Sequence, residues 1–450
     1  MRIILDFPGK GQLDFAATTI APEPIPTQMM KYYIPILLLF SVLAGACFPI
    51  LQSRYVTAAD IEQLPQNYDN GAERRINGPY SGQWEPYLPD TNHLDHTPMR
   101  YIRVNVHWMN TADTLFPFTG KEAEVYTRNL IRAANYDLNK NRKMYLPYRN
   151  DTPVFPTGYR YVLTPRPDVP GDDGIYFHFD DELYYYVHRG KNRNLYRRDV
   201  FDKYGVQMDT VLNIFIMPHH PDSIASSTYS AFGVGVALSN AVKIAGIYAN
   251  HNKHDDYWGF RGVWNHEVGH ILGLSHAWVK DGCDDTPEHG QECFSNKQPP
   301  PCDTATSNNL MDYAAEQNAW SPCQIGRIHQ RLSMENSTPR KFLAPNWCTL
   351  KDSMEVIIRD TVVWNGDRDL EGHLTIERGG QLTIRCRVSM PPDGAITIAP
   401  GGMLVLDGAR LHNACGKQWD GIIVQKTGTT AGKLVLIGAP KLEEMRHALE

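Results

Sequence analysis

The pattern of apolar and polar positions divides the chain into regions of different texture. Apolar residues alternate with polar ones over 101–108, which predicts a strand, and then recur at helical spacing over 121–139. Further strands are expected at 159–164, 174–179 and 211–217, and a glycine-rich one at 231–238. Strand, helix and further strands in this order predict an α+β domain, which we place at residues 99–348.

Residues 349–450 consist of short apolar triplets separated by paired glycines. The segments 374–376, 379–380 and 382–384 recur 22 residues later as 396–398, 401–402 and 404–406. Strands this short at this period favour a parallel β-helix, or β-solenoid, with 422–424 and 434–436 in a longer further coil. A β-sandwich is the alternative. Such a module more often supports or tethers than catalyses, and its ligand would be a glycan, a protein or only the neighbouring coil.

The residues before the first strand form two segments. The apolar run 32–46 follows Lys31, is about fifteen residues long and ends in small residues, so residues 1–47 are interpreted as an N-terminal extension with a signal peptide. Because 43–47 resembles a bacterial lipobox, Cys47 is a candidate for lipidation and for the chain's one link to a membrane. Residues 48–98 are rich in Pro, Asn, Gln and Asp, which is typical of a linker or a propeptide.

The charge of the chain limits its possible binding partners, and its cysteines indicate the compartment in which it folds. The net charge of −6 and the scattered Lys and Arg residues leave no basic footprint for nucleic acid. Four of the eight cysteines, Cys283, Cys293, Cys302 and Cys323, lie in one loop-rich segment, where two disulfides are expected and three pairings are open. Cys348, Cys386 and Cys415 leave an odd one over. An extracytoplasmic protein follows, either secreted or in a bacterial cell envelope, and an outer-membrane lipoprotein if Cys47 is lipidated.

The strongest chemical signal is the run from His266 to His276. Since His266 and His270 are four residues apart, a helix projects both from one face, where they can bind one ion. Glu267 is then the candidate general base. Gly273 can leave the helix through a positive φ and turn the chain back, which would deliver His276 as a third ligand. This spacing predicts one catalytic zinc ion; the alternative is a chance match on a surface helix.

These residues resemble the metzincin zinc metalloproteases, whose signature is H-E-x-x-H-x-x-G-x-x-H followed by a methionine turn. The segment 309–313, N-L-M-D-Y, resembles that turn in the pappalysin branch. The resemblance implies a mixed twisted sheet plus an active-site helix for residues 99–348, with the strand at 231–238 as the edge that pairs with an extended substrate. It also implies that Met311 forms a hydrophobic floor beneath the metal and that Tyr313 stabilises the tetrahedral intermediate.

The same resemblance implies further features around the site. The segment 283–287 resembles a pappalysin segment at a structural calcium site, so Asp285 and Thr286 are candidate calcium ligands, with an Asx-turn before proline as the alternative. Glu316 is expected to line the S1′ pocket and to favour a basic residue. The favoured disulfide pairing is Cys283 with Cys302 and Cys293 with Cys323.

The sequence therefore predicts a secreted or surface-anchored zinc endopeptidase that acts on a protein or peptide. The alternative is an envelope adhesion or binding protein, whose solenoid carries the function and whose protease-like domain is a platform. The presence of Glu267 favours the enzyme, because a degenerate site could lose this residue and still bind zinc.

Overall fold

The computed structural model describes residues 50–63, 83–112, 118–227, 233–250 and 256–448. The chain divides into two compact units, Met1–Ile50 and Leu51–Glu450, and nearly all of the described residues belong to the second. The expected signal peptide and Cys47 lie outside the described residues. None of the helices that these residues form has the length and apolar character that a membrane span requires.

A six-stranded mixed sheet is the centre of the first domain (the sheet domain). Its order is β3-β2-β5-β7-β6, and β4 also pairs with β2, beyond the end of β3. All of these pairings are parallel except that of β6 with β7, so β6 is an antiparallel edge strand. The expected mixed sheet is confirmed. The strands are β2 Arg100–Asn110, β3 Tyr159–Leu163, β4 Ile175–Phe179, β5 Leu212–Met217, β6 Val234–Ala237 and β7 Ala241–Ala245.

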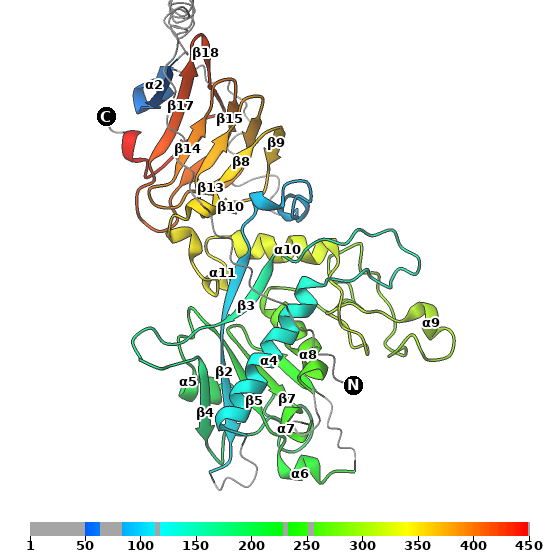
Figure 1. The fold of residues 1–450 in the computed structure, drawn as a ribbon. Coiled ribbons are helices and arrows are strands. Elements are labelled where there is room, and N and C mark those ends of the chain that lie inside the picture. Colours follow the sequence, from blue (N-terminus) through cyan, green and yellow to red (C-terminus); the bar gives the residue numbers. More distant parts are fainter. Residues whose placement is uncertain (1–49, 64–82, 113–117, 228–232, 251–255, 449–450) are drawn as a thin grey trace, which may run out of the picture. The chain divides into compact units, whose positions relative to one another are not determined.

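The two long helices, α4 Gly120–Asn139 and α8 Tyr257–Ile271, run side by side over one face of the sheet (Figure 1). Buried residues of both helices share one apolar core with the inward side chains of β2, β5 and β7. The other face packs against a second cluster, to which α5 Asp199–Tyr204 and the segment before it contribute Tyr186 and Phe201. This burial on both faces explains why every residue of β5 is buried and why all of them except Asn213 are apolar.

The remaining helices of this region are shorter than α4 and α8. The best defined is α10, which begins with a capping box between Ser321 and Gln324. These helices are α6 Pro221–Ile224, α7 Ile247–Asn250, α9 Cys302–Ala305, α10 Pro322–Ser333, α11 Thr338–Lys341 and the 3₁₀ turns η3 Asn346–Cys348 and η4 Asp352–Met354.

The C-terminal region is a parallel β-helix of four stacked coils, so the β-sandwich alternative is wrong. Leu374 pairs in parallel with Ile396, and Leu382 with Leu404, which is the 22-residue period. One strand from each coil enters each of three sheets, whose orders are β8-β11-β14-β17, β9-β12-β15-β19 and β10-β13-β16-β20. The strands are β8 Val356–Ile358, β9 Thr361–Trp364, β10 Arg368–Asp369, β11 Leu374–Ile376, β12 Gln381–Ile384, β13 Arg387–Ser389, β14 Ala395–Ile398, β15 Met403–Asp407, β16 Arg410–His412, β17 Gly421–Thr427, β18 Thr430–Ala431, β19 Lys433–Ile437 and β20 Lys441–Leu442, before η5 Arg446–Ala448.

The described parts of residues 48–98 pack against the solenoid. A solvated linker would not make such contacts. Strand β1, Leu51–Tyr55, pairs antiparallel with β17, and Val56 is buried in the solenoid core. His96, at the end of η2 Leu94–His96, is buried with its ring against Trp364. Helix α2 Ala58–Gln63 and η1 Glu85–Tyr87 complete this part. The composition that suggested a linker does not report these contacts, because short strands need few apolar residues.

A buried ion cluster joins the sheet domain to the solenoid. The carboxylate of Asp369 accepts two hydrogen bonds from Arg340, at 2.6 and 2.9 Å, and one from Arg387, at 2.8 Å. Arg100, at the start of β2, lies 3.5 Å from the same carboxylate. The Cys348–Cys415 disulfide adds a covalent link, and Cys386 remains a free, buried thiol.

Asp180 provides a test of the pH dependence of folding. Burial would raise its pKa, but hydrogen bonds from Lys203, from the backbone N–H groups of residues 182 and 183 and from Tyr204 lower it to about 2. Because Lys203 is largely exposed, we expect Asp180→Asn to reduce the free energy of unfolding by about 1–2 kcal/mol at pH 7.

The sign of this effect follows from the lowered pKa of Asp180. The stabilisation is complete above the unfolded-state pKa of about 4 and is lost as the pH falls through about 2. Urea unfolding of both proteins at several pH values between these limits would show the difference shrinking toward acid. A difference that does not change with pH would mean that the charge of this carboxylate is not the cause.

Candidate metal centre

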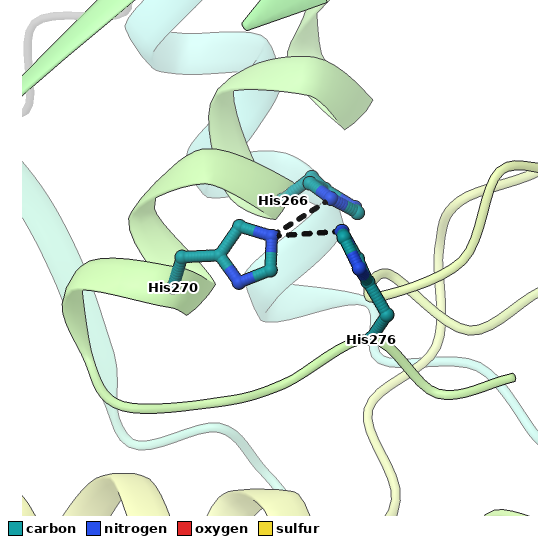
Figure 2. A group of neighbouring side chains, drawn as sticks. All are labelled: His266, His270 and His276. Atoms are coloured by element: carbon teal, nitrogen blue, oxygen red, sulfur yellow. Dashed lines mark hydrogen bonds between the residues drawn. The ribbon is translucent and has the colours of Figure 1, made fainter. Parts of the chain in front are cut away.

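Three imidazoles converge at the C-terminal end of α8. His266 and His270 project from successive turns of the helix, and His276 reaches the same point from the segment that follows (Figure 2). The Nε2 atom of His270 lies 3.2 Å from that of His266 and 3.1 Å from that of His276. Gly273, at φ +92°, turns the chain out of the helix and so makes the approach of His276 possible.

The hydrogen bonds of these rings show that they suit a cation. Nδ1 of His266 lies 2.8 Å from the carbonyl oxygen of Leu310, and Nδ1 of His270 lies 2.9 Å from that of Leu274. Since a carbonyl oxygen only accepts, both Nδ1 atoms carry the proton and both Nε2 atoms present lone pairs to each other. Burial lowers the pKa of His266 to about 3 and that of His276 to about 4, which keeps these rings neutral.

The spacing of the three nitrogens fits zinc. Ligands about 2.0–2.1 Å from a tetrahedral zinc ion lie about 3.3–3.4 Å apart, close to the Nε2 separations found here. Three neutral imidazoles with one position left open are the ligand set of a catalytic zinc site, in contrast to a closed structural site. The residues present therefore fit the metal that the sequence predicts.

Glu267 lies between the histidines and the edge strand β6. Its side chain is buried, and burial raises its pKa to about 8, an effect that a hydrogen bond from the backbone of Ala237 partly opposes. A Cβ atom at Gly235 would lie 2.5 Å from Cγ of Glu267, so only glycine allows β6 to approach this closely. The carboxyl is thus held at the edge of the sheet, beside the three imidazoles.

The methionine turn lies directly beneath the helix. Met311 is fully buried, and a Cβ atom at Gly269 would overlap its sulfur. The backbone of Ala277 donates to the carbonyl oxygen of Met311 at 2.9 Å, which ties the segment of the third histidine to the turn. The turn therefore supports the helix and the His276 segment together.

Tyr313 lies at the histidine cluster. Its hydroxyl is 3.3 Å from Nε2 of His276, and its ring is 54% exposed. Asp312 holds the turn by accepting from the backbone N–H of Tyr313 and from Nε2 of His289, at 2.6 Å each. The hydrogen bond to Asp312 raises the pKa of His289, which favours the charged form of this imidazole.

Several residues near the site were not expected from the sequence. Nε2 of Gln317 lies 3.4 Å from Nδ1 of His266, and Trp278 stacks on His276 with ring centroids 4.0 Å apart. Tyr186, far from the motif in sequence, donates from its hydroxyl to the carbonyl oxygen of Gly235 at 3.3 Å. A glycine within a strand-like run was the one available signal, because it marks a close approach of backbone to another group.

The two candidate calcium ligands are engaged in protein hydrogen bonds. Asp285 accepts from Oγ of Ser321 at 2.7 Å and from the backbone of Cys323 at 2.9 Å, so it holds the N-terminus of α10. Thr286 donates to Asp281 at 2.8 Å. These contacts account for both side chains without a cation, and calcium binding stays a prediction.

The expected disulfide pairing is wrong. Cys283 pairs with Cys323, with Cα atoms 5.6 Å apart, because Asp285 fastens the loop to the start of α10 beside Cys323. Cys293 pairs with Cys302, only nine residues along the chain, with Cα atoms 5.0 Å apart. Each cysteine is thus bonded to a partner other than the one that the family resemblance implied.

Glu316 is half-buried and follows the methionine turn. Its carboxylate accepts from the hydroxyl of Tyr145 at 2.6 Å. Tyr145 also lines a cavity of about 320 Å³ with Lys143, Arg149 and Asp303. The S1′ role of Glu316 stays a prediction.

Comparison with known proteins agrees with this geometry. Residues 223–338 match the sequence model of Metallo-peptidase family M12B Reprolysin-like, and this stretch holds β6, α8, the three histidines and the methionine turn. No curated protein matches the chain.

Two solved structures are similar at low identity. One is mirolysin in complex with compound 9, at 18% identity and a TM-score of 0.38, covering 55% of this chain and 96% of that one. The other is mature mirolysin of Tannerella forsythia in complex with a cleaved peptide, at 18% identity and a TM-score of 0.35, covering 55% and 95%. Overlap at this level carries no argument about activity.

Proposed function

We propose that this chain, which carries a metzincin-type metalloprotease domain, is a zinc-dependent endopeptidase of the pappalysin-like branch that acts outside the cytoplasm. The convergence of three Nε2 atoms beside the buried carboxyl of Glu267 carries the proposal. Tyr313 beside His276 supports the branch. The three disulfides support the location, since such bonds persist in oxidising compartments.

Each residue of the site has a separate role in peptide hydrolysis. His266, His270 and His276 would hold the zinc ion, which when bound supplies a Lewis acid that makes water a nucleophile near neutral pH. Glu267 accepts the proton of the attacking water and returns it to the leaving amine nitrogen. The hydroxyl of Tyr313 donates a hydrogen bond to the oxygen on which negative charge develops.

Strand β6 would hold the substrate. Among the described strands it pairs only with β7, so its other side can form backbone hydrogen bonds with an extended peptide. Backbone pairing of this kind would fix the scissile bond near Glu267, which lies against Gly235 in the middle of this strand.

The test uses the full chain, stripped of metal by a chelator and then titrated with zinc while a diverse peptide library is followed by mass spectrometry. We expect one equivalent of zinc to bind and to restore cleavage. His270→Ala should lose both, whereas His373→Ala, in the solenoid, should lose neither. Zinc bound without cleavage would instead favour the binding-protein alternative, and failure to bind zinc would overturn the proposal.

Gly235 offers a finer test of the site. We expect Gly235→Ala to lower kcat/KM about 10- to 100-fold, because the new Cβ must displace the carboxyl of Glu267 by a few tenths of an ångström or more. Zinc binding should be retained. Gly259→Ala is the matched control, since its Cβ would meet only Oδ1 of Asp256, at 3.5 Å. Full activity of Gly235→Ala would show that this close approach does not position Glu267.

A further inference from the structure

The segment 185–198, which we call the basic loop, contains five Arg and Lys residues and contacts the edge strand β6. Arg189, Lys191 and Arg193 are exposed at its tip, and none of them pairs with a carboxylate among the described residues. The carboxylate of Asp222 accepts a hydrogen bond from the side-chain amide of Asn192 at 3.1 Å, but among the described residues it forms no ion pair with these three cations. The tip therefore presents positive charge to solvent that no described acidic side chain neutralises.

The base of the basic loop is held firmly. The side chain of Asn194 accepts from the backbone of Val187 at 2.8 Å and donates to the carbonyl oxygen of Tyr185 at 2.7 Å. Lys243, buried on β7, donates to the carbonyl oxygen of Asn194 at 3.0 Å. Arg198 donates to the carbonyl oxygen of residue 238, just after β6, at 2.8 Å. The two ends of the basic loop are thus hydrogen-bonded to the sheet and to the turn that follows β6, and the cations at the tip lie between these ends.

The start of the basic loop contacts the edge strand of the sheet. The hydroxyl of Tyr186 donates to Gly235, the residue of β6 against which Glu267 packs. Burial raises the pKa of Tyr186, the charge of Glu267 adds to this rise, and the guanidinium of Arg193 opposes it. Tyr186 therefore joins the start of the basic loop to the strand against which Glu267 packs.

We propose that the tip of the basic loop selects peptides with an acidic side chain close to the scissile bond. This inference rests on the proposed peptidase function, since a peptide paired with β6 would pass beside the tip. An aspartate or glutamate there would meet three cations that have no described acidic partner, whereas a lysine would be repelled.

The experiment is a charge scan on one cleaved peptide. Glutamate, glutamine and lysine are placed in turn at each position within about four residues of the scissile bond, and kcat/KM is measured for the wild-type chain and for R189E/R193E. Dissociation constants for the same peptides are measured by fluorescence anisotropy in the Glu267→Gln background, so that selection is read without cleavage. Lys433→Glu, an exposed charge reversal on the solenoid, is the matched control.

We expect glutamate to be preferred over glutamine about fivefold in at least one position, and R189E/R193E to prefer lysine there instead. Raising the salt should weaken the preference, because the charges are exposed. Cleavage with no charge preference, or a preference that R189E/R193E leaves unchanged, would overturn the inference while the peptidase function stands. Charge-dependent binding without any cleavage by the wild-type chain would overturn the peptidase function, and with it the selection of peptides about a scissile bond.

An anionic glycan is the competing ligand of the tip. A sulfated polysaccharide that binds the wild-type chain but not R189E/R193E, together with peptide binding that is indifferent to charge, would overturn the inference. Absence of both cleavage and peptide binding would overturn the inference and the proposed function together.

Discussion

Glutamine in place of Glu267 is expected to lower kcat/KM for peptide cleavage about 10³-fold while zinc remains bound at the histidines. The amide has nearly the shape of the carboxylate and can occupy the same space against Gly235, but it cannot accept the proton of the attacking water. The expected loss is therefore in kcat, because substrate pairing along β6 and the imidazole cluster are unchanged.

The measurement is single-substrate kinetics with zinc content determined on the same samples. Glu122→Gln is the matched control, since Glu122 is exposed in the first turn of α4, away from the cluster. We expect it to leave kcat/KM within about twofold of the wild-type value. A Glu267→Gln protein that keeps a tenth or more of the activity with a full equivalent of zinc would exclude Glu267 as the general base.

Asparagine in place of Asp369 is expected to reduce the free energy of unfolding by about 3–5 kcal/mol. The side chain of Asp369 is completely buried, and those of its partners Arg100, Arg340 and Arg387 are at most 7% exposed. Removing this carboxylate leaves three guanidinium groups facing each other, and the carboxylate of Asp367, 3.8 Å from Arg387, lies beside only one of them. Burial acts to raise the pKa of Asp369, but the three arginines outweigh it and hold the pKa far below its usual range.

Asp369 and Asp180 both have lowered pKa values, so the pH dependence of their stabilisation has the same sign. A carboxyl whose folded-state pKa is lowered this far stays charged in mild acid, so the cost of Asp369→Asn should be the same at pH 4 as at pH 7. Asp173→Asn is the control, because its ion pair with Arg128 is exposed on both sides and should contribute less than about 1 kcal/mol. Urea unfolding followed by tryptophan fluorescence would compare them. A loss below about 1 kcal/mol for Asp369→Asn would mean that the cluster relaxes around the amide.

The sequence predicted the features that depend on local periodicity. The 22-residue repeat matched the pairing of Leu374 with Ile396, because a coil of a β-helix repeats in register with its neighbour. The spacing of His266, Glu267 and His270 also predicted a site, since the period of a helix determines which residues share a face.

The features that depend on contacts distant in sequence could not be predicted. Strand β7 contains Lys243, and a lysine is compatible with a buried strand only because backbone carbonyl oxygens of the basic loop accept hydrogen bonds from its ammonium group. The pairing of Cys283 with Cys323 depends on Asp285 reaching the start of α10, which no cysteine spacing reports. Tyr186 lies on the face of the sheet away from α4 and α8, and its hydroxyl contacts the edge strand from there.

Strand β1 has a consequence for the integrity of the solenoid. It lies early in the chain, yet its partner β17 belongs to the last coil, so that coil acquires a covered edge only when synthesis is nearly finished. Proteolytic trimming up to Tyr55 would leave the backbone groups of β17 unpaired and open to a strand from another copy of the chain. In the intact chain, β1 covers this edge of β17.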